Sequence, residues 1–396
     1  MSHTEPLAET RSAGHTAALQ AAAAGDMADA TRLLREAVLE VNGADLLNDL
    51  AVTRQALGMR QDAETLLRAA LLIDPKHRDA QANLPRLAAP RVPSIQSGVL
   101  VSLCNGGVPV LGLVDPDTLA FERIDLLGHL PALGVTGLAA QGDRVYAVLH
   151  NLRDPLTWLG TSQGALMVLD RATLRLISQY PMRGHDVHSV AVLDDTVYAV
   201  STGTDEVIAL DMDGDEVRSE RVFWRPDNGL DRNDHHHLNA IAVHEGDLLV
   251  CGFGRKADGD RWSAARDGFI YNITREREVV RGIYQPHSVI SMGGGLGYCE
   301  SPLLAARLPD GRSAIDLPGY CRGLCAIGDK LYIATSQGRR RSKSTGEINN
   351  PSATGIPSGS TGVFRLNSQD LTVEAGIDLG LNAPEIYDLM AWKAAA

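Results

Sequence analysis

A two-strand unit that recurs six times constrains the fold of this chain more than any other feature. The first five copies have a short apolar run, a polar turn with Gly or Asp, and a second apolar run, the pattern of a β-hairpin, and the sixth has the first run alone. Further strand-like runs, such as 165–169 and 176–180, follow most copies. Six units of four strands predict an all-β six-bladed β-propeller. The copies are TGLAAQGDRVYAV from Thr136, HSVAVLDDTVYAV from His188, NAIAVHEGDLLVC from Asn239, HSVISMGGGLGYC from His287, RGLCAIGDKLYIA from Arg322 and the shorter YDLMAW from Tyr387.

The sixth copy has only its first strand, so its blade needs strands from elsewhere. Three apolar runs near the start of the β-region, at 98–104, 108–114 and 119–127, have no first strand of their own. We expect these runs to complete the last blade, so that a propeller over 98–392 is closed by strands from both of its ends. Such closure leaves no open sheet edge.

A second repeat, with a period of 33 residues, precedes the propeller. It pairs Gly25 with Gly58, Ala30 with Ala63, Leu34 with Leu67 and Ala37 with Ala70. Glycine suits the turn between two helices, small residues suit their crossing, and Pro75 ends the second helix. The pattern resembles the tetratricopeptide repeat over 12–76, with a further copy begun at 77–84. The prediction is therefore tetratricopeptide-like helical hairpins at 12–84, joined by a proline-rich linker at 85–97.

Composition excludes several classes of partner. The net charge is −12 and the pI is about 5.4, which argues against binding of nucleic acid. The sequence has no apolar stretch of about 18 residues, so no membrane partner is expected. Five cysteines without a CxxC pair, and a start without an apolar leader, favour the cytoplasm. The triplet 293–295 opens no helix, so no nucleotide cofactor is expected.

The residues that begin the six copies are all polar. The first strand of each blade lines the central channel of a propeller, so these residues are expected at one level of that channel. Converging polar side chains indicate a pocket for a small polar ligand. The six positions are Thr136, His188, Asn239, His287, Arg322 and Tyr387.

Three interpretations of these residues stay open. In the first, His188, His237 and His287 bind a divalent metal such as Zn, Fe, Cu or Ni, which imidazole suits. In the second, His188 and His287 act as general acid and base. In the third, the ring is structural and its histidines hydrogen-bond water and backbone.

The remaining polar positions have expected roles in substrate binding. Arg322 would hold a carboxylate or phosphate through its planar guanidinium. Tyr387 and Asn239 would orient the substrate, while Thr136 and Glu300 would line the pocket. A polar segment at 337–361 is too long for a hairpin turn and is expected to be mobile or to form a lid.

Three strings resemble a family of mostly uncharacterised bacterial proteins with HLNGLA-, HSP- and LPGFTRGL-like motifs, some of which carry tetratricopeptide repeats ahead of a propeller. They are HLNAIAV at 237–243, PHSV at 286–289 and LPGYCRGLCAIGDKLYIATSQGRRR at 317–341. The resemblance covers about 98–392 and implies that His237, Asn239, His287, Ser288, Arg322 and Gly323 are motif positions. More distantly, the ring resembles the six-bladed lactonase and strictosidine-synthase-like propellers, which bind a metal or an amine substrate in the channel.

Two functions from different classes follow. The first is an enzyme that acts on a small polar, anionic or amino-acid-like metabolite in the channel, by histidine acid–base or metal-assisted chemistry; lyase, hydrolase and isomerase reactions stay open. The second is a non-catalytic adaptor, in which the helical repeats and the propeller rim each bind a protein or peptide partner.

Overall fold

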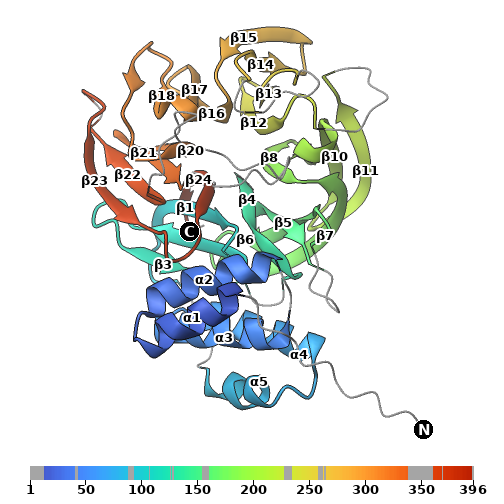
Figure 1. Cartoon of the computed structure of the whole chain (residues 1–396). Helices are drawn as coiled ribbons and strands as arrows, with labels where there is room; N and C mark the ends of the chain where they lie inside the picture. The colour runs from blue at the N-terminus through green and yellow to red at the C-terminus, as the bar shows by residue number, and fades with distance from the viewer. Residues whose placement is uncertain are drawn as a thin grey trace. The chain divides into compact units, whose positions relative to one another are not determined.

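The computed structural model describes residues 13–40, 43–87, 93–106, 108–124, 126, 129–153, 160–226, 234–256, 262, 265–337, 360–367 and 369–394. The chain divides into two compact units, one helical and one made of strands. Figure 1 shows the helices in blue and the strands from cyan to red. Most of the segment 337–361 lies outside the described residues.

The helical unit contains α1 (Ala13–Ala23), α2 (Met27–Glu40), α3 (Ala44–Ala56), α4 (Arg60–Ile73), α5 (Arg78–Asn83) and a 3₁₀ turn (Leu84–Arg86). The repeat glycines Gly25 and Gly58 lie in the turns α1–α2 and α3–α4, with φ of 84° and 79°. That left-handed conformation favours glycine. The repeat alanines Ala30 and Ala63 are fully buried, so helices approach closely there. The unit is thus a set of short helices in hairpins, and its tetratricopeptide type stays a prediction.

The strand unit is a propeller of six four-stranded antiparallel sheets, which confirms the blade count. Blade 1 has β4 (Ala132–Gln141), β5 (Arg144–Leu152), β6 (Gln163–Asp170) and β7 (Leu176–His185); blade 2 has β8 (Val187–Leu193), β9 (Thr196–Ser201), β10 (Glu206–Asp213) and β11 (Glu216–Trp224); blade 3 has β12 (Leu238–His244), β13 (Asp247–Gly252), β14 (Gly268–Asn272) and β15 (Arg277–Ile283). Blade 4 has β16 (Pro286–Met292), β17 (Gly295–Glu300), β18 (Ala305–Arg307) and β19 (Ser313–Ala314); blade 5 has β20 (Tyr320–Ile327), β21 (Lys330–Ser336), β22 (Gly362–Leu366) and β23 (Val373–Asp378).

Blade 6 combines strands from both ends of the unit, as expected. Its order is β24 (Glu385–Lys393), β1 (Ser97–Cys104), β2 (Val110–Val114) and β3 (Phe121–Arg123). The β24–β1 register runs from Ser97 opposite Lys393 to Cys104 opposite Glu385. β3 is shorter than the apolar run at 119–127 that predicted it.

The core lies between neighbouring blades. Apolar side chains of each sheet pack against the next sheet around the ring. At the junction of blades 6 and 1, Leu100, Val135 and Trp392 belong to one buried cluster. The inner strands β4, β8, β12, β16, β20 and β24 contact one another in sequence and close the ring, as Figure 1 shows.

Each inner strand has a register shift at its polar ring position. The pairing of each inner strand with its neighbour skips Thr136, His188, Asn239, Arg322 and Tyr387, while in β16 it shifts directly after His287. A bulge breaks the ladder and re-aims the side chain of the unpaired residue. The six bulges therefore explain how polar residues can open otherwise apolar strands.

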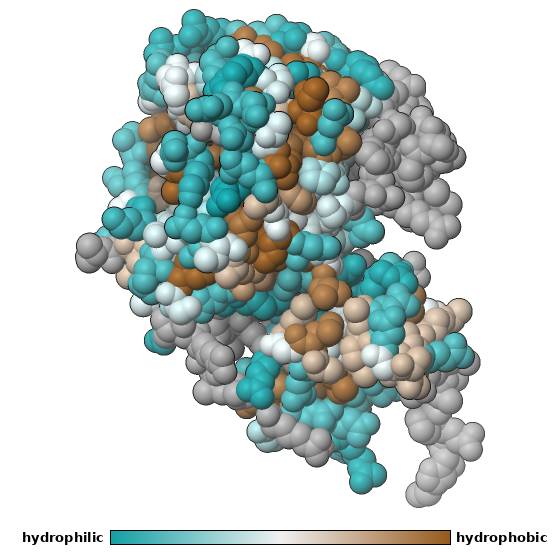
Figure 2. Space-filling model, turned by 90° about the vertical axis from the view of Figure 1, so that its left-hand side faces the viewer, coloured by the Kyte–Doolittle hydropathy of each residue, from teal (hydrophilic) through white to brown (hydrophobic). Residues whose placement is uncertain are grey.

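Figure 2 shows one side of the surface, on which hydrophilic residues surround smaller hydrophobic areas. This mixture is ordinary for a folded protein surface. Within the described ranges, every helix is too short or too polar to cross a lipid bilayer.

Candidate functional site

The ring residues of four blades lie on a closed circuit of contacts between aromatic rings and one guanidinium. Neighbouring members are 4.3–5.5 Å apart, measured between ring centroids or from the arginine Cζ to a centroid. The circuit brings together five of the predicted site residues, His188, His237, His287, Arg322 and Tyr387. In order, its members are Tyr387, His188, His237, Phe253, His287, Tyr320 and Arg322.

Two histidines and one carboxylate converge beside this circuit. Asp186 Oδ1 lies 3.3 Å from His188 Nε2 and 3.6 Å from His150 Nδ1. All three ligand atoms lie within 4.8 Å of one another. Ligands at 2.0–2.2 Å from a tetrahedral zinc ion are separated by about 3.3–3.6 Å, from the geometry of a tetrahedron with those bond lengths. The spacing of the two short edges therefore fits a metal ion bound between these side chains.

Local backbone geometry places the three ligands together. Asp186 lies in the bend before β8 with φ of 50°, a left-handed conformation that directs its carboxylate back toward His188. His150, near the end of β5, pairs with Gly134 of β4. A Cβ at Gly134 would lie 2.4 Å from Cys104 Cα, so only glycine allows blades 6 and 1 to meet beside His150.

The protonation states of this cluster suit a metal ion. Burial raises the pKa of Asp186, but the attraction of His188, their hydrogen bond and the charge of His150 outweigh it and hold that pKa well below its usual value. Burial lowers the pKa of His188, and Asp186 opposes this only in part. An ionised carboxylate beside a neutral imidazole is the form that binds metals.

The second nitrogen of His188 is also held. Asn239 Nδ2 lies 3.4 Å from His188 Nδ1, and a half-turn of that amide would place its carbonyl oxygen there as an acceptor. Histidine ligands of metals commonly donate their other N–H in this way. The Tyr387 hydroxyl lies 3.3 Å from His188 Nε2, on the side of the cluster.

Arg322 is held in the ring by a buried carboxylate and two aromatic faces. Its Nη1 lies 3.4 Å from Glu385 Oε2, and Asn105 donates to the other oxygen of Glu385 at 3.0 Å. The Arg322 Cζ lies 4.3 Å from the centroid of Tyr387 and 5.5 Å from that of Tyr320. A guanidinium fixed in one orientation is a preorganised partner for a carboxylate or phosphate.

Of the three histidines that the sequence suggested as metal ligands, the grouped ligand set contains His188 alone, although the His188 and His237 ring centroids lie 5.5 Å apart. His237 Nδ1 lies 3.0 Å from both carboxylate oxygens of Asp234. His287 Nδ1 contacts Gln285 and Ser301. In the described part of the chain, the grouped ligand atoms are those of His150, Asp186 and His188.

Two residues expected to bind substrate contact neighbouring residues of the blades. The Thr136 hydroxyl donates to the Val187 carbonyl at 2.8 Å and joins blades 1 and 2. Glu300 accepts from the Tyr284 N–H at 3.0 Å and pairs with Arg307 Nε at 2.5 Å, so both of its oxygens bind blade residues. Asn239 lies in the ring, beside His188.

Sequence reasoning missed His150 and Glu385 and did not assign Asp186 a role. A positional signal existed for two of them. Asp186 and Glu385 stand two residues before the ring residues His188 and Tyr387, as Tyr320 stands before Arg322. The residues two positions ahead therefore form a second tier of the site. His150 comes from a second strand, β5, and has no such signal.

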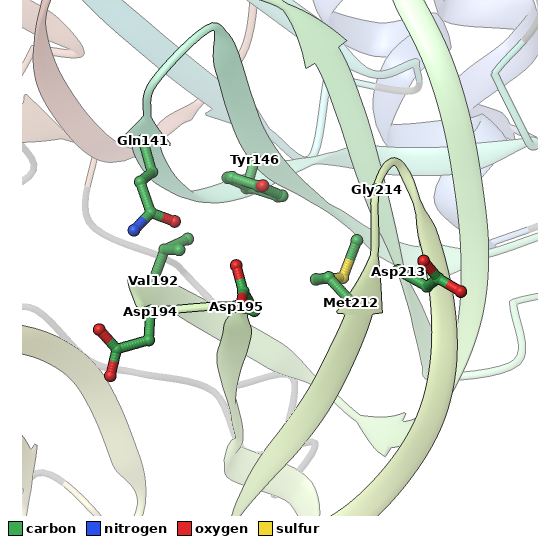
Figure 3. A pocket seen from close by; sticks show the side chains of 8 residues that line it. All are labelled: Gln141, Tyr146, Val192, Asp194, Asp195, Met212, Asp213 and Gly214. Carbon is green, nitrogen blue, oxygen red and sulfur yellow. The ribbon is translucent and has the colours of Figure 1, made fainter.

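A cavity of about 280 Å³ lies elsewhere in the propeller (Figure 3). It is lined by Gln141, Tyr146, Val192, Asp194, Asp195, Met212, Asp213 and Gly214. Asp194 follows β8 at the end opposite His188, six residues away, or about 20 Å along an extended strand. None of the metal-cluster or circuit residues lines this cavity.

Asp388, beside Tyr387, makes the stability of the propeller depend on pH. Burial raises its pKa to about 7, although the N–H groups of Leu138 and Leu389 donate to it. Between about pH 4 and pH 7 the unfolded chain releases this proton and the native chain keeps it. The free energy of unfolding should fall by up to about 1.4 kcal/mol per pH unit as pH rises through this window.

Asp388→Asn stays neutral and should lack this component of the pH dependence. Urea denaturation of both proteins at pH 5 and pH 8 measures it, since all other titrating groups are shared. We expect the stability of the variant relative to wild type to rise with pH. An equal difference at both pH values would contradict the assigned pKa.

Comparisons with known proteins bear on the fold. Solved structures similar to this chain include a protein of unknown function from Bacteroides caccae, with 14% identity, 75% of this chain and 99% of that chain covered, and a TM-score of 0.49. A chain of a nidogen/laminin complex has 13% identity, 76% and 100% coverage and a TM-score of 0.50. A periplasmic gluconolactonase of Pseudomonas aeruginosa has 13% identity, 76% and 99% coverage and a TM-score of 0.46. At such low identity a likeness concerns the fold alone.

No curated protein matches this chain. One protein family matches over residues 170–394, a range that includes blades 2 to 5, the strand β24 and every residue of the circuit. Because this match spans more than half of the chain, the protein belongs to the family described as "Domain of unknown function (DUF4915)".

Proposed function

We propose that this protein is a metal-dependent enzyme that acts on a small anionic metabolite at the mouth of the propeller channel. The observation that carries the proposal is the convergence of His150, Asp186 and His188, with edges of 3.3 and 3.6 Å. An ion pair with a structural role at the surface does not require two buried imidazoles beside one carboxylate. His150 and His188 are 1% and 5% exposed, whereas the Asp186 side chain keeps 32% of its surface open to solvent.

Zinc is the proposed metal. Two imidazoles and one carboxylate are a set that binds Zn²⁺ in catalytic sites and Fe²⁺ in non-haem oxygenases, and both leave positions open for substrate or water. Magnesium and calcium prefer oxygen ligands. When bound there, zinc would act as a Lewis acid on a substrate oxygen.

The proposed substrate is anionic because of Arg322. Its guanidinium contacts the Tyr387 ring, and Tyr387 contacts His188, so the cation and the metal ligands border the same group. Glu385 compensates part of the Arg322 charge, and the aromatic faces exclude water from it. A carboxylate or phosphate would bind Arg322 while another oxygen of the same molecule faces the metal cluster.

A turnover experiment with small metabolites tests the proposal. Zinc-loaded protein is incubated with a bacterial metabolite extract, and losses are measured by liquid chromatography with mass spectrometry. We expect wild type to consume at least one anionic metabolite, and EDTA or His188→Ala to prevent this. His244→Ala is the matched control, since His244 at the end of β12 bonds Ser291 of β16 and is not a member of the circuit.

Consumption that is independent of zinc and His188 would contradict the metal-dependent mechanism. The absence of any consumption by zinc-loaded wild type would contradict the enzyme proposal as a whole, and the non-catalytic adaptor would then be favoured.

A further inference from the structure

We propose that His287 is the general base of this site, that Nε2 is its reactive atom, and that Gln285 and Ser301 are the positioning residues that select this nitrogen. The inference rests on the proposed function and adds to it the group that activates water. The metal ligands alone are compatible with several reactions, and a general base that activates water selects hydrolysis among them.

Hydrogen bonds around Nδ1 define the tautomer of His287. The Gln285 carbonyl lies 3.0 Å from Nδ1 and can only accept, so Nδ1 carries the proton. The Ser301 hydroxyl lies 2.6 Å from the same nitrogen and donates to the Cys321 carbonyl at 2.5 Å. Since its proton is used there, Ser301 accepts from Nδ1 as well. Two acceptors on Nδ1 leave the lone pair on Nε2.

The Nε2 atom of His287 is buried and has no hydrogen-bond partner among the described residues. The whole residue is 2% exposed. Burying an acceptor without a partner costs about 1–3 kcal/mol, which a structural histidine would avoid. The ring lies between Phe253 and Tyr320 on the circuit, with centroid distances of 5.2 and 5.5 Å. The ring that carries the unpartnered atom is therefore a member of the same circuit as Arg322 and the cluster residue His188.

The charges that face His287 couple its basicity to an anionic substrate. Burial, followed by the positive charge of Arg322, holds its pKa well below the usual value, and His237 and His188 act in the same direction. The neutral imidazole is therefore ready to accept a proton. An anion bound at Arg322 would neutralise the positive charge of that guanidinium and so raise the basicity of Nε2 when substrate is present.

The proposed step balances as a hydrolysis. The Nε2 lone pair takes one proton from a water molecule, and the water oxygen forms a bond to the acyl carbon of the substrate. The carbonyl π electrons move to the carbonyl oxygen as negative charge. They return when the bond to the leaving group breaks, and the His287 imidazolium gives its proton to that group. Net, one water molecule is added across an acyl bond.

Nitrogen NMR of full-length protein with ¹⁵N-labelled histidine tests the tautomer without any substrate. His287→Gln identifies the signal. We expect the Nδ1–H form of a neutral ring at pH 7. An Nε2–H tautomer or an imidazolium at that pH would overturn the assignment of the reactive atom.

Turnover of the metabolite extract tests the catalytic role, with zinc content measured in parallel. His287→Gln should bind zinc like wild type and lose about 10²–10⁴-fold in rate, the range that general bases contribute. The consumed metabolite should yield products whose summed mass is larger by one water. Equal turnover by His287→Gln, or products without added water, would overturn the inference while the metal-dependent enzyme stands.

Ser301→Ala tests positioning. Loss of an acceptor from Nδ1–H disfavours the protonated ring, so the acid limb of the pH–rate profile should move to lower pH, and a second tautomer should appear by NMR. Ser301→Thr should restore both. Ser291→Ala, which removes the hydroxyl partner of His244, is the matched control and should change neither. An unchanged profile for Ser301→Ala would remove Ser301 from the mechanism. If zinc-loaded wild type consumes nothing, both the proposed function and the role of His287 fall.

Discussion

Asp186→Asn is expected to bind zinc about 10²–10³-fold more weakly than the wild-type protein. A structural zinc site contributes about 10–16 kcal/mol through four ligands, so one ligand accounts for about 2.5–4 kcal/mol. Asn keeps the shape of Asp and removes the charge that faces both His150 and His188. The variant therefore separates loss of the carboxylate ligand from loss of packing. Calorimetric titration of the full-length protein with zinc measures the affinity.

Asp234→Asn is the matched control for this substitution. Asp234 is also a partly buried carboxylate paired with a histidine, but its partner His237 lies outside the grouped ligand atoms. Zinc affinity should change less than about tenfold in this control, and thermal denaturation should show that both variants are folded. Equal zinc affinities for wild type and Asp186→Asn would show that the metal binds elsewhere.

Trp392→Ala is expected to destabilise the propeller by about 3–5 kcal/mol, the usual loss when a buried tryptophan is truncated to alanine. Trp392 is 4% exposed and lies in the cluster between blades 6 and 1. Its indole N–H also donates to the Arg171 carbonyl of blade 1 at 3.1 Å. The substitution therefore weakens the packing between blade 6, which contains β24, and blade 1. Urea denaturation followed by circular dichroism measures the change.

Phe223→Ala provides the comparison for an aromatic residue outside this junction. Phe223 is 36% exposed on the outer strand β11, so its loss should cost less than about 1 kcal/mol. A Trp392→Ala protein as stable as Phe223→Ala would contradict the importance of closure by β24.

The propeller could be predicted from sequence because each blade repeats the same physical requirement. A strand that faces two neighbouring sheets must be apolar, and its hairpin turn must be polar, so six copies of that pattern are visible without alignment. The closure by the runs at 98–104 and 108–114 followed from counting strands. The strand β24, which pairs with the first of these runs, begins at Glu385, two residues before the ring position.

The sequence predicted which residues lie at one level of the channel, but it did not predict which of their side chains lie together. His188, His287 and Arg322 each begin an inner strand, so the sequence predicted that they lie around the channel axis. The contact circuit contains all three. Which side chains meet depends on bulges and on left-handed residues such as Asp186, and neither leaves a periodic signal. His150 reaches the site from the second strand of its blade. The partner of Glu300, Arg307, could not be predicted because the two residues become adjacent only when β17 and β18 pair.

The central claim is that two imidazoles and one carboxylate form a metal site in the channel. X-ray absorption at the zinc edge, on full-length protein loaded with one equivalent of zinc, tests it most directly. The expected spectrum shows four nitrogen or oxygen neighbours at about 2.0–2.1 Å with the outer-shell scattering of two imidazoles. A sulfur neighbour at about 2.3 Å, or a shell of water oxygens without imidazole, would contradict the claim.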